Sequence, residues 1–156
     1  MIKGLLISVH DNEVYEIMLD KKSMLKDLYG VIGTNVIDVV RRVYIGDTLY
    51  DIIVDDEGLL KEDRKPSARC DDAEQVLFGN IVVVRGNEET GEFDTLENFD
   101  IDNIQNHIFG LHDRNTNELS PFLTYTYNKE LDNDIEVDRK RVAWPTRQAR
   151  YNIAIT

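Results

Sequence analysis

The chain has 156 residues, of which 42% are hydrophobic and 31% are charged, and its formal net charge is −12. This composition is too apolar for a disordered chain, and no apolar run reaches the roughly 20 residues that a membrane-spanning helix needs. A chain of this length can bury a core of its own. A single cysteine, Cys70, excludes an intramolecular disulfide and a metal site built from thiolates, so we expect a reducing cytosol.

The charge is distributed unevenly along the chain. Residues 1–66 carry 9 basic and 13 acidic side chains, residues 67–136 carry 4 and 16, and residues 137–156 carry 5 and 1. The acidic middle repels nucleic acid and attracts basic surfaces. The basic C-terminal segment either folds back onto the acidic middle or binds an acidic partner.

The first third of the chain predicts two pairs of strands around one helix. Residues 2–9 and 14–19 alternate like strands on either side of a polar turn. Ser23 can cap a helix over residues 24–31, which has one apolar stripe, and Gly33 can end it. Residues 36–45 and 48–54 predict a second strand pair around a turn at Gly46. This β-β-α-β-β order predicts an α+β fold with a helix across a small mixed sheet, similar to a β-grasp arrangement.

The rest of the chain predicts shorter elements. Residues 60–72 are polar and without a period, which is typical of a surface loop, and residues 81–85 predict a strand. A helix is expected over residues 100–109, with Asp100 as its N-cap and Gly110 as its end. Strand candidates follow at residues 119–127, 135–144 and 151–155. We therefore expect an α+β core domain over residues 1–110, with one or two short helices, and a mostly β extension over residues 111–156 packed on it.

Four blocks of the chain resemble a family of unknown function. They are Val-Asp-Asp-Glu-Gly-Leu-Leu at residues 54–60, Pro-Ser-Ala at 66–68, Phe-Gly-Asn-Ile-Val-Val-Val at 78–84 and Gly-Glu-Phe-Asp-Thr-Leu at 91–96. In order and spacing they are similar to domain of unknown function 3846, and the resemblance covers residues 2–104. It implies a phage, plasmid or other mobile-element setting, and it brings no catalytic residues. The chain departs from the family pattern at residues 61–66, where Lys-Glu-Asp-Arg-Lys-Pro replaces a Leu-Pro-x-Asn-like stretch.

No residue pattern predicts a reaction, a cofactor or a metal site. The glycines at 79, 86 and 91 match neither a P-loop nor a dinucleotide fingerprint. A metal site at His107, His112 and Asp113 is opposed by the histidine spacing, because side chains five residues apart point about 140° apart on a helix. Arg69 beside Cys70 favours a reactive thiolate, but Asp71 and Asp72 oppose it. The carboxylates at residues 55–57 lack the oxygen spacing of a calcium loop.

Two patterns suggest binding surfaces. Asp132, Asp134, Glu136 and Asp138 would lie on one face of a strand, about 7 Å apart. With Asp94, Glu97, Asp100 and Asp102 they form a hypothetical partner-binding face that imitates a nucleic-acid backbone; the alternative is the solvent face of an edge strand. Leu123, Tyr125 and Tyr127 also share a strand face, which either packs in the core or receives a base or a peptide.

We predict a cytosolic, non-enzymatic protein that binds the basic surface of a host protein. A nucleic-acid-handling protein such as a defence nuclease fits this charge best. Neither membrane association nor direct nucleic-acid binding by the acidic middle is expected. Two alternatives stay open: a structural or assembly protein that forms homo-oligomers through strand edges, and a small-ligand or nucleotide-binding domain built on the turn at residues 86–91 and the segment at residues 60–72.

Overall fold

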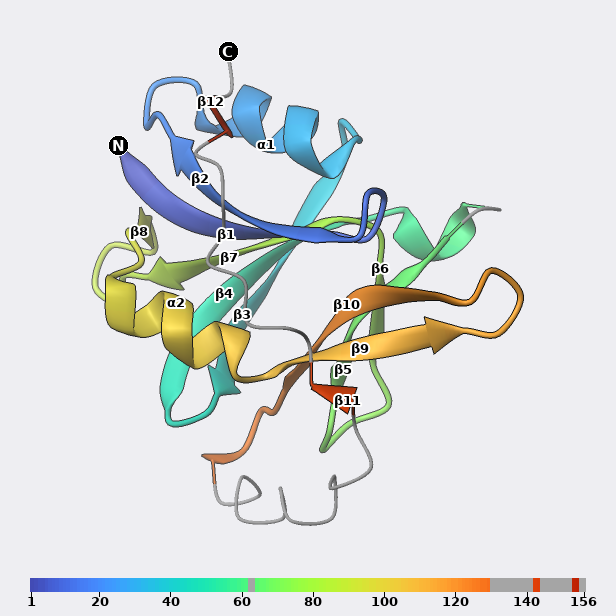
Figure 1. The fold of residues 1–156 in the computed structure, drawn as a ribbon. Helices are drawn as coiled ribbons and strands as arrows, with labels where there is room; N and C mark the ends of the chain where they lie inside the picture. Colours follow the sequence, from blue (N-terminus) through green and yellow to red (C-terminus); the bar gives the residue numbers. More distant parts are fainter. Residues whose placement is uncertain (62–63, 130–141, 144–152, 155–156) are drawn as a thin grey trace.

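The computed structural model describes residues 1–61, 64–129, 142–143 and 153–154 of the chain. These residues form two β-sheets and two α-helices (Figure 1), which confirms the predicted α+β class. The first half contains β1 (Ile2–Ser8), β2 (Glu13–Leu19), α1 (Met24–Ile32), β3 (Ile37–Ile45), β4 (Thr48–Asp55) and a 3-10 helix, η1 (Gly58–Leu60). The second half contains β5 (Pro66–Cys70), β6 (Val76–Phe78), β7 (Ile81–Gly86), β8 (Phe93–Asp94), α2 (Asn98–Gln105), β9 (Ile108–Asp113), β10 (Glu118–Tyr125), β11 (Val142–Ala143) and β12 (Ile153–Ala154).

The larger sheet has the strand order β12-β2-β1-β7-β4-β3, and β8 pairs with the end of β7. The β1–β2 and β3–β4 hairpins form its two halves, as the sequence predicts. Between them lies β7, which is antiparallel to both β1 and β4. The residues Ile81–Val84 are all buried because both faces of this central strand are covered.

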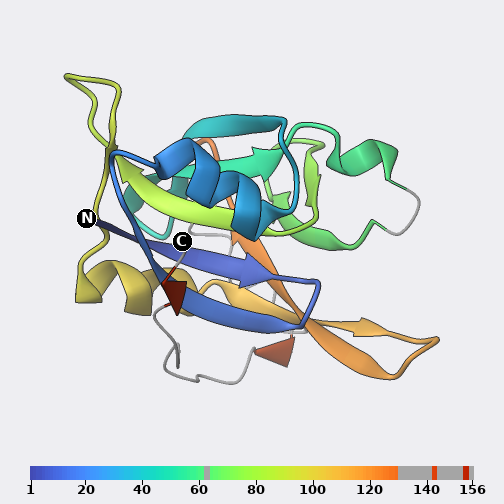
Figure 2. The same cartoon turned by 90° about the horizontal axis from the view of Figure 1, so that it is seen from above.

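Two apolar clusters fill the spaces on either side of the larger sheet. One cluster joins this sheet to Leu28 and Ile32 of α1. The other joins the opposite face to α2, through Ile101 and Ile104, and to the second sheet. Figures 1 and 2 show the same arrangement, with α1 on one side of the sheet and α2 on the other.

Helix α1 has the predicted bounds within one residue and ends at the predicted glycine. Gly33 has φ 82°, and its N–H donates to the carbonyl of Tyr29 at 2.9 Å. The predicted side-chain cap is wrong in detail. The Ser23 hydroxyl donates to the carboxylate of Asp27 (3.1 Å) and makes no capping bond to the helix backbone.

The second sheet has the strand order β11-β9-β10-β5-β6, and it corrects two expectations. Part of the expected surface loop at residues 60–72 is β5, whose Ser67 and Ala68 are fully buried beside β10. The second helix begins and ends earlier than predicted, at Asn98–Gln105, because residues from Ile108 onward pair with β10. Residues 110–111, where we expected the core domain to meet the extension, lie within β9, and the division into these two parts stays a prediction.

The edge of the larger sheet at β3 is irregular. A β-bulge between Val40 and Val43 interrupts its pairing with β4. The Val39 N–H donates to the carboxylate of Asp38 (2.8 Å), the residue directly before it. Near its end β3 also meets the second sheet, since Tyr44 and Thr126 exchange two backbone hydrogen bonds of 2.7 and 2.9 Å. Within the described part of the chain, no helix is both long enough and apolar enough to cross a membrane.

Candidate functional site

The structure separates the predicted acidic residues into an exposed group and one buried member. Asp94, Glu97 and Asp102 are exposed on β8 and around α2. Asp100 is fully buried, so its assignment to an exposed acidic face is wrong. The other predicted carboxylates, Asp132, Asp134, Glu136 and Asp138, lie outside the described residues.

The Asp100 carboxylate holds α2 against the larger sheet. Its Oδ1 accepts hydrogen bonds from the Tyr50 hydroxyl (2.8 Å) and from Nε of Arg85 (3.1 Å). Its Oδ2 accepts from the N–H of Glu97 (2.8 Å), which completes a capping box at the start of the helix. Burial raises the pKa of Tyr50 to about 12. The hydrogen bond from Asn103 lowers this pKa, and the Asp100 carboxylate raises it further. Asp100 is therefore a structural residue.

Exposed carboxylates lie on either side of Asp100 in the sequence. The sequence contains no Lys or Arg between Arg85 and Arg114. Within this interval six exposed residues of the β7–β8 turn, β8 and the α2 region form what we call the acidic strip: Glu88, Glu89, Glu92, Asp94, Glu97 and Asp102. Among the described residues, the only salt bridge of the strip joins Glu88 to Arg42 (3.1 Å). Phe99, which is 59% exposed, lies on the same helix as Asp102.

The turn that presents half of the strip is well defined. Asn87 closes it by donating its N–H to the carbonyl of Glu92 and accepting the N–H of Gly91, both at 2.8 Å. Its side-chain oxygen also accepts the N–H groups of Glu89 (3.0 Å) and Thr90 (3.3 Å). The backbone of the strip is thus fixed by local hydrogen bonds, which lowers the entropy cost of binding a partner.

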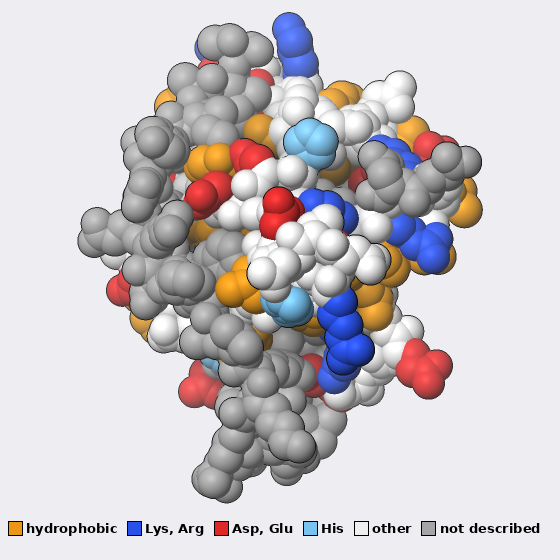
Figure 3. Space-filling view, turned by 45° about the vertical axis from the view of Figure 1, so that its right-hand side comes forward, with side chains coloured by type: hydrophobic (Ala, Val, Ile, Leu, Met, Phe, Trp, Pro, Cys, Tyr) orange, Lys and Arg blue, Asp and Glu red, His pale blue; other side chains and the backbone are white. Residues whose placement is uncertain are grey.

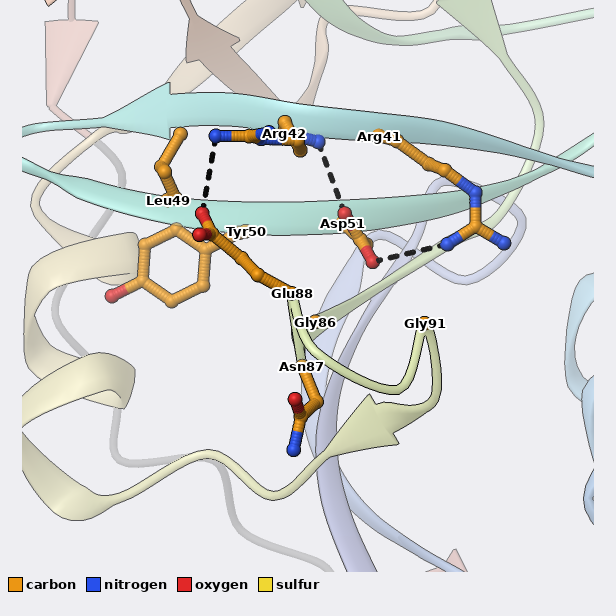
Figure 4. Close-up of a pocket in the computed structure, with 9 residues that line it drawn as sticks. All are labelled: Arg41, Arg42, Leu49, Tyr50, Asp51, Gly86, Asn87, Glu88 and Gly91. Atoms are coloured by element: carbon orange, nitrogen blue, oxygen red, sulfur yellow. Dashed lines mark hydrogen bonds and ion pairs between the residues drawn. The ribbon is translucent and has the colours of Figure 1, made fainter.

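A pocket of about 150 Å³ lies at the base of this turn (Figure 4). The β-bulge in β3 gives Arg42 a φ of 58° and lets its N–H donate to Oδ1 of the buried Asp51 at 3.0 Å. Arg41 approaches Oδ2 of the same carboxylate at 3.8 Å. A Cβ at Gly86 would lie 2.3 Å from Asp51 Oδ2, so a larger residue there would displace the Asp51 carboxylate. The residues around the pocket therefore connect the acidic turn to β3, through the Arg42–Glu88 salt bridge.

The family comparison covers both the strip and this pocket. Residues 2–108 match the family model described as Domain of unknown function (DUF3846). The chain belongs to the DUF3846 family. No curated protein and no solved structure matches the chain. The acidic strip and the pocket therefore lie in the DUF3846 domain, whereas most of β9 and all of β10 follow it.

The DUF3846 domain and the strands after it do not bring the candidate metal ligands together. His107 Nδ1 lies 2.9 Å from the carbonyl oxygen of Asn103, and His112 Nε2 lies 2.8 Å from Oδ1 of Asn117. Within the described residues, no group of three or more His, Cys, Asp or Glu side chains could hold a metal ion.

Cys70 is buried between the second sheet and the rest of the core. Its thiol donates to Asp72 Oδ1 at 2.9 Å. Burial raises the pKa of this thiol to about 11, and the hydrogen bond to the Asp72 carboxylate adds to the effect. This direction is opposite to the lowered pKa that is typical of a nucleophilic cysteine.

The aromatic face predicted on residues 123–127 is mostly core. Leu123 and Tyr125 are buried, and Tyr127 is partly exposed. The Tyr125 and Tyr127 hydroxyls both donate to Oε1 of Gln75, at 2.6 and 2.5 Å, and the two rings meet edge to face. These two rings therefore pack against each other.

Sequence reasoning missed the pocket and the role of Asp100. The adjacent Arg41 and Arg42, in the middle of a predicted strand, were the available signal, because two neighbouring residues of a regular strand point to opposite faces. A bulge places two residues opposite one and changes this alternation. The partners of Asp100 come from other elements: Tyr50 lies on β4, 50 residues away in the sequence, and Arg85 lies on β7, 15 residues away.

Proposed function

We propose that this protein acts by binding the basic surface of another protein through the acidic strip. The observation that supports this most directly is the row of exposed carboxylates over residues 88–102. Among the described residues, only one basic side chain, Arg42, forms a salt bridge with this row. Such a row raises the rate of encounter with a basic partner and makes the affinity fall with salt.

Phe99 favours a protein partner over a merely solvated acidic face. An aromatic ring exposed beside carboxylates can bury apolar area at the centre of an interface, where aromatic residues contribute most of the binding energy. The strip also has the preorganisation that tight binding needs. Asp100 fixes α2, and Asn87 closes the turn that holds Glu88, Glu89 and Glu92.

The partner we propose is a nucleic-acid-handling protein of the host, with a groove that normally receives phosphates. The strip would occupy this groove, as the carboxylates of a nucleic-acid mimic would. The mobile-element setting that the family resemblance implies fits an inhibitor of a host defence nuclease. Chemistry by this protein is no part of the proposal, and neither is nucleic-acid binding by the strip.

The test is affinity capture from a host lysate at low and high salt, with three forms of the protein. The strip variant combines Glu89→Gln, Glu92→Gln and Asp102→Asn, which leaves Asp100 and the helix cap intact. The matched control combines Asp56→Asn, Glu57→Gln and Glu74→Gln, which removes three exposed carboxylates elsewhere. Phe99→Ala tests the aromatic contact separately.

We expect a partner that the native protein and the control capture at low salt, that high salt releases, and that the strip variant and Phe99→Ala lose. Adding the native protein should then inhibit DNA or RNA binding by the purified partner. Equal capture by the strip variant and the control, or capture that salt leaves unchanged, would show that the strip does not bind.

A further inference from the structure

A large cleft in the described part of the molecule lies away from the acidic strip. It has a volume of about 600 Å³ and is formed by the β1–β2 turn, the end of α1, η1 and the β6–β7 turn. This is within the range of small-molecule sites in proteins. Figure 3 shows the side of the molecule to which these elements belong, with Lys, Arg and His side chains among a few carboxylates.

Basic residues gather at this cleft although the chain is strongly acidic. His10, Lys61, Arg64 and Lys65 line it. Its one described carboxylate, Asp55, is buried and accepts a hydrogen bond from Lys61 Nζ at 2.6 Å. Burial alone would raise the pKa of Asp55, but hydrogen bonds from Lys61 and the Glu57 N–H lower it overall. Lys61 thus neutralises this carboxylate.

Of the remaining cations, Lys65 lies near the Asp113 carboxylate and, after a backbone hydrogen bond from Asn115, contributes to lowering its pKa. Arg64 and Lys65 form no salt bridge within the described part of the chain, which omits Glu62 and Asp63. The Arg64 guanidinium lies over the Phe78 ring, with its carbon 5.2 Å from the ring centre, and Nη1 donates to the carbonyl of Leu59. These contacts hold the guanidinium in place without neutralising it.

Glycines keep the opposite wall of the cleft open. Gly30 lies inside α1, where glycine is less favourable than alanine. A Cβ at Gly30 would have no atom within 4 Å, so packing does not require a glycine there. Gly33 and Gly79, with φ values of 82° and 84°, also face empty space. This wall therefore exposes backbone, which a ligand can approach closely.

Asn80 connects the parts of the cleft. Its side-chain nitrogen donates to the carbonyl of Val31 in α1 (3.1 Å), and its oxygen accepts the N–H of His10 (3.2 Å). The helix end and the β1–β2 turn are therefore held at a fixed separation. The opening exists without any ligand, as in most small-molecule sites.

We propose that this cleft binds a small phosphate-bearing molecule. Arg64 and Lys65 contact the phosphate, because guanidinium and ammonium groups donate charge-assisted hydrogen bonds to phosphate oxygens. The glycine wall receives the remainder of the ligand. This site shares no residue with the acidic strip, so the two proposals stand or fall separately.

The experiment is calorimetric titration of the full chain with inorganic phosphate, pyrophosphate and AMP, with adenosine as an uncharged control. We expect saturable binding of at least one phosphate-bearing probe and none of adenosine. The amide NMR signals of Gly33 and Gly79 should shift during the same titration.

Two pairs of variants locate the site. Gly30→Glu places a carboxylate in the cleft and should weaken binding at least tenfold, whereas Gly30→Ala should change it less than twofold. Arg64→Ala with Lys65→Ala should also weaken binding at least tenfold. Lys21→Ala with Lys22→Ala removes two charges outside the cleft and should have little effect. The proposal is overturned if none of the three phosphate-bearing probes binds at millimolar concentration, or if both double variants lose affinity equally.

Discussion

Replacing Asp100 by alanine should destabilise the fold far more than replacing Asp102, two residues further along α2. Without the carboxylate, the buried Tyr50 hydroxyl loses its acceptor, at a cost of about 1–2 kcal/mol. Loss of the capping box costs about 1 kcal/mol. The half-exposed Arg85 loses a charged hydrogen bond worth about 1–2 kcal/mol. Together these effects amount to about 4 kcal/mol.

Urea unfolding followed by circular dichroism measures this difference. For a protein of this size, 4 kcal/mol corresponds to a fall in the melting temperature of roughly 8–16 °C. The exposed Asp102→Ala should stay within about 0.5 kcal/mol of the native protein. Asp100→Asn keeps one oxygen acceptor and should lie between the two. Equal unfolding midpoints for the two alanine variants would refute the structural role of Asp100 and return it to the candidates for the binding surface.

Three further predictions concern local features. Gly86→Ala should destabilise the fold by about 1–3 kcal/mol, because the new Cβ would overlap the Asp51 carboxylate. Gly30→Ala, in contrast, should stabilise the fold by up to about 1 kcal/mol. Equal effects of the two changes in urea melts would contradict the close contact at Gly86. The pKa of Tyr50 is about 12 in the folded state, above its ordinary value of 10. The contribution of Tyr50 to the free energy of unfolding is therefore fully present below pH 10. It is lost as the pH rises toward 12, by at most about 3 kcal/mol. Tyr50→Phe should flatten this fall between pH 10 and pH 12, and an unchanged slope would assign the fall to other groups. Iodoacetamide should label Cys70 slowly at pH 7.5 and much faster in urea; fast labelling of the folded protein would show that the thiol is accessible.

The sequence was sufficient where a local signal determines the structure. Alternation along residues 2–19 and the glycine at position 33 predict the first hairpin and the end of α1 correctly. The sequence was insufficient where burial depends on pairing between strands that are distant in the chain. Ala68 looks like part of a polar loop, but β10 pairs with it through Leu123, which lies 55 residues further along the chain.

The second helix shows the same limit in another form. Ile101, Ile104 and Ile108 fit one helical face, yet Ile108 pairs with Leu123 as the first residue of β9. The periodicity of 3.6 residues cannot tell a continued helix from a strand that begins nearby. The candidate site had a similar weakness. Acidic composition pointed to Asp94, Glu97 and Asp102, which are exposed, but it could not show that Asp100 is buried.

The bridge between Tyr44 and Thr126 has a consequence for what constitutes the folding unit. The family match ends at residue 108, but Thr126 follows directly after β10, the strand that pairs with both β5 and β9. A chain cut after residue 108 would leave one side of β5 without its hydrogen-bonding partner and would uncover Ala68 and Ile104 in the shared core. The segment that matches the family model and the set of strands that share one core therefore differ in length. The strands after residue 108 complete the core on which the matched segment packs.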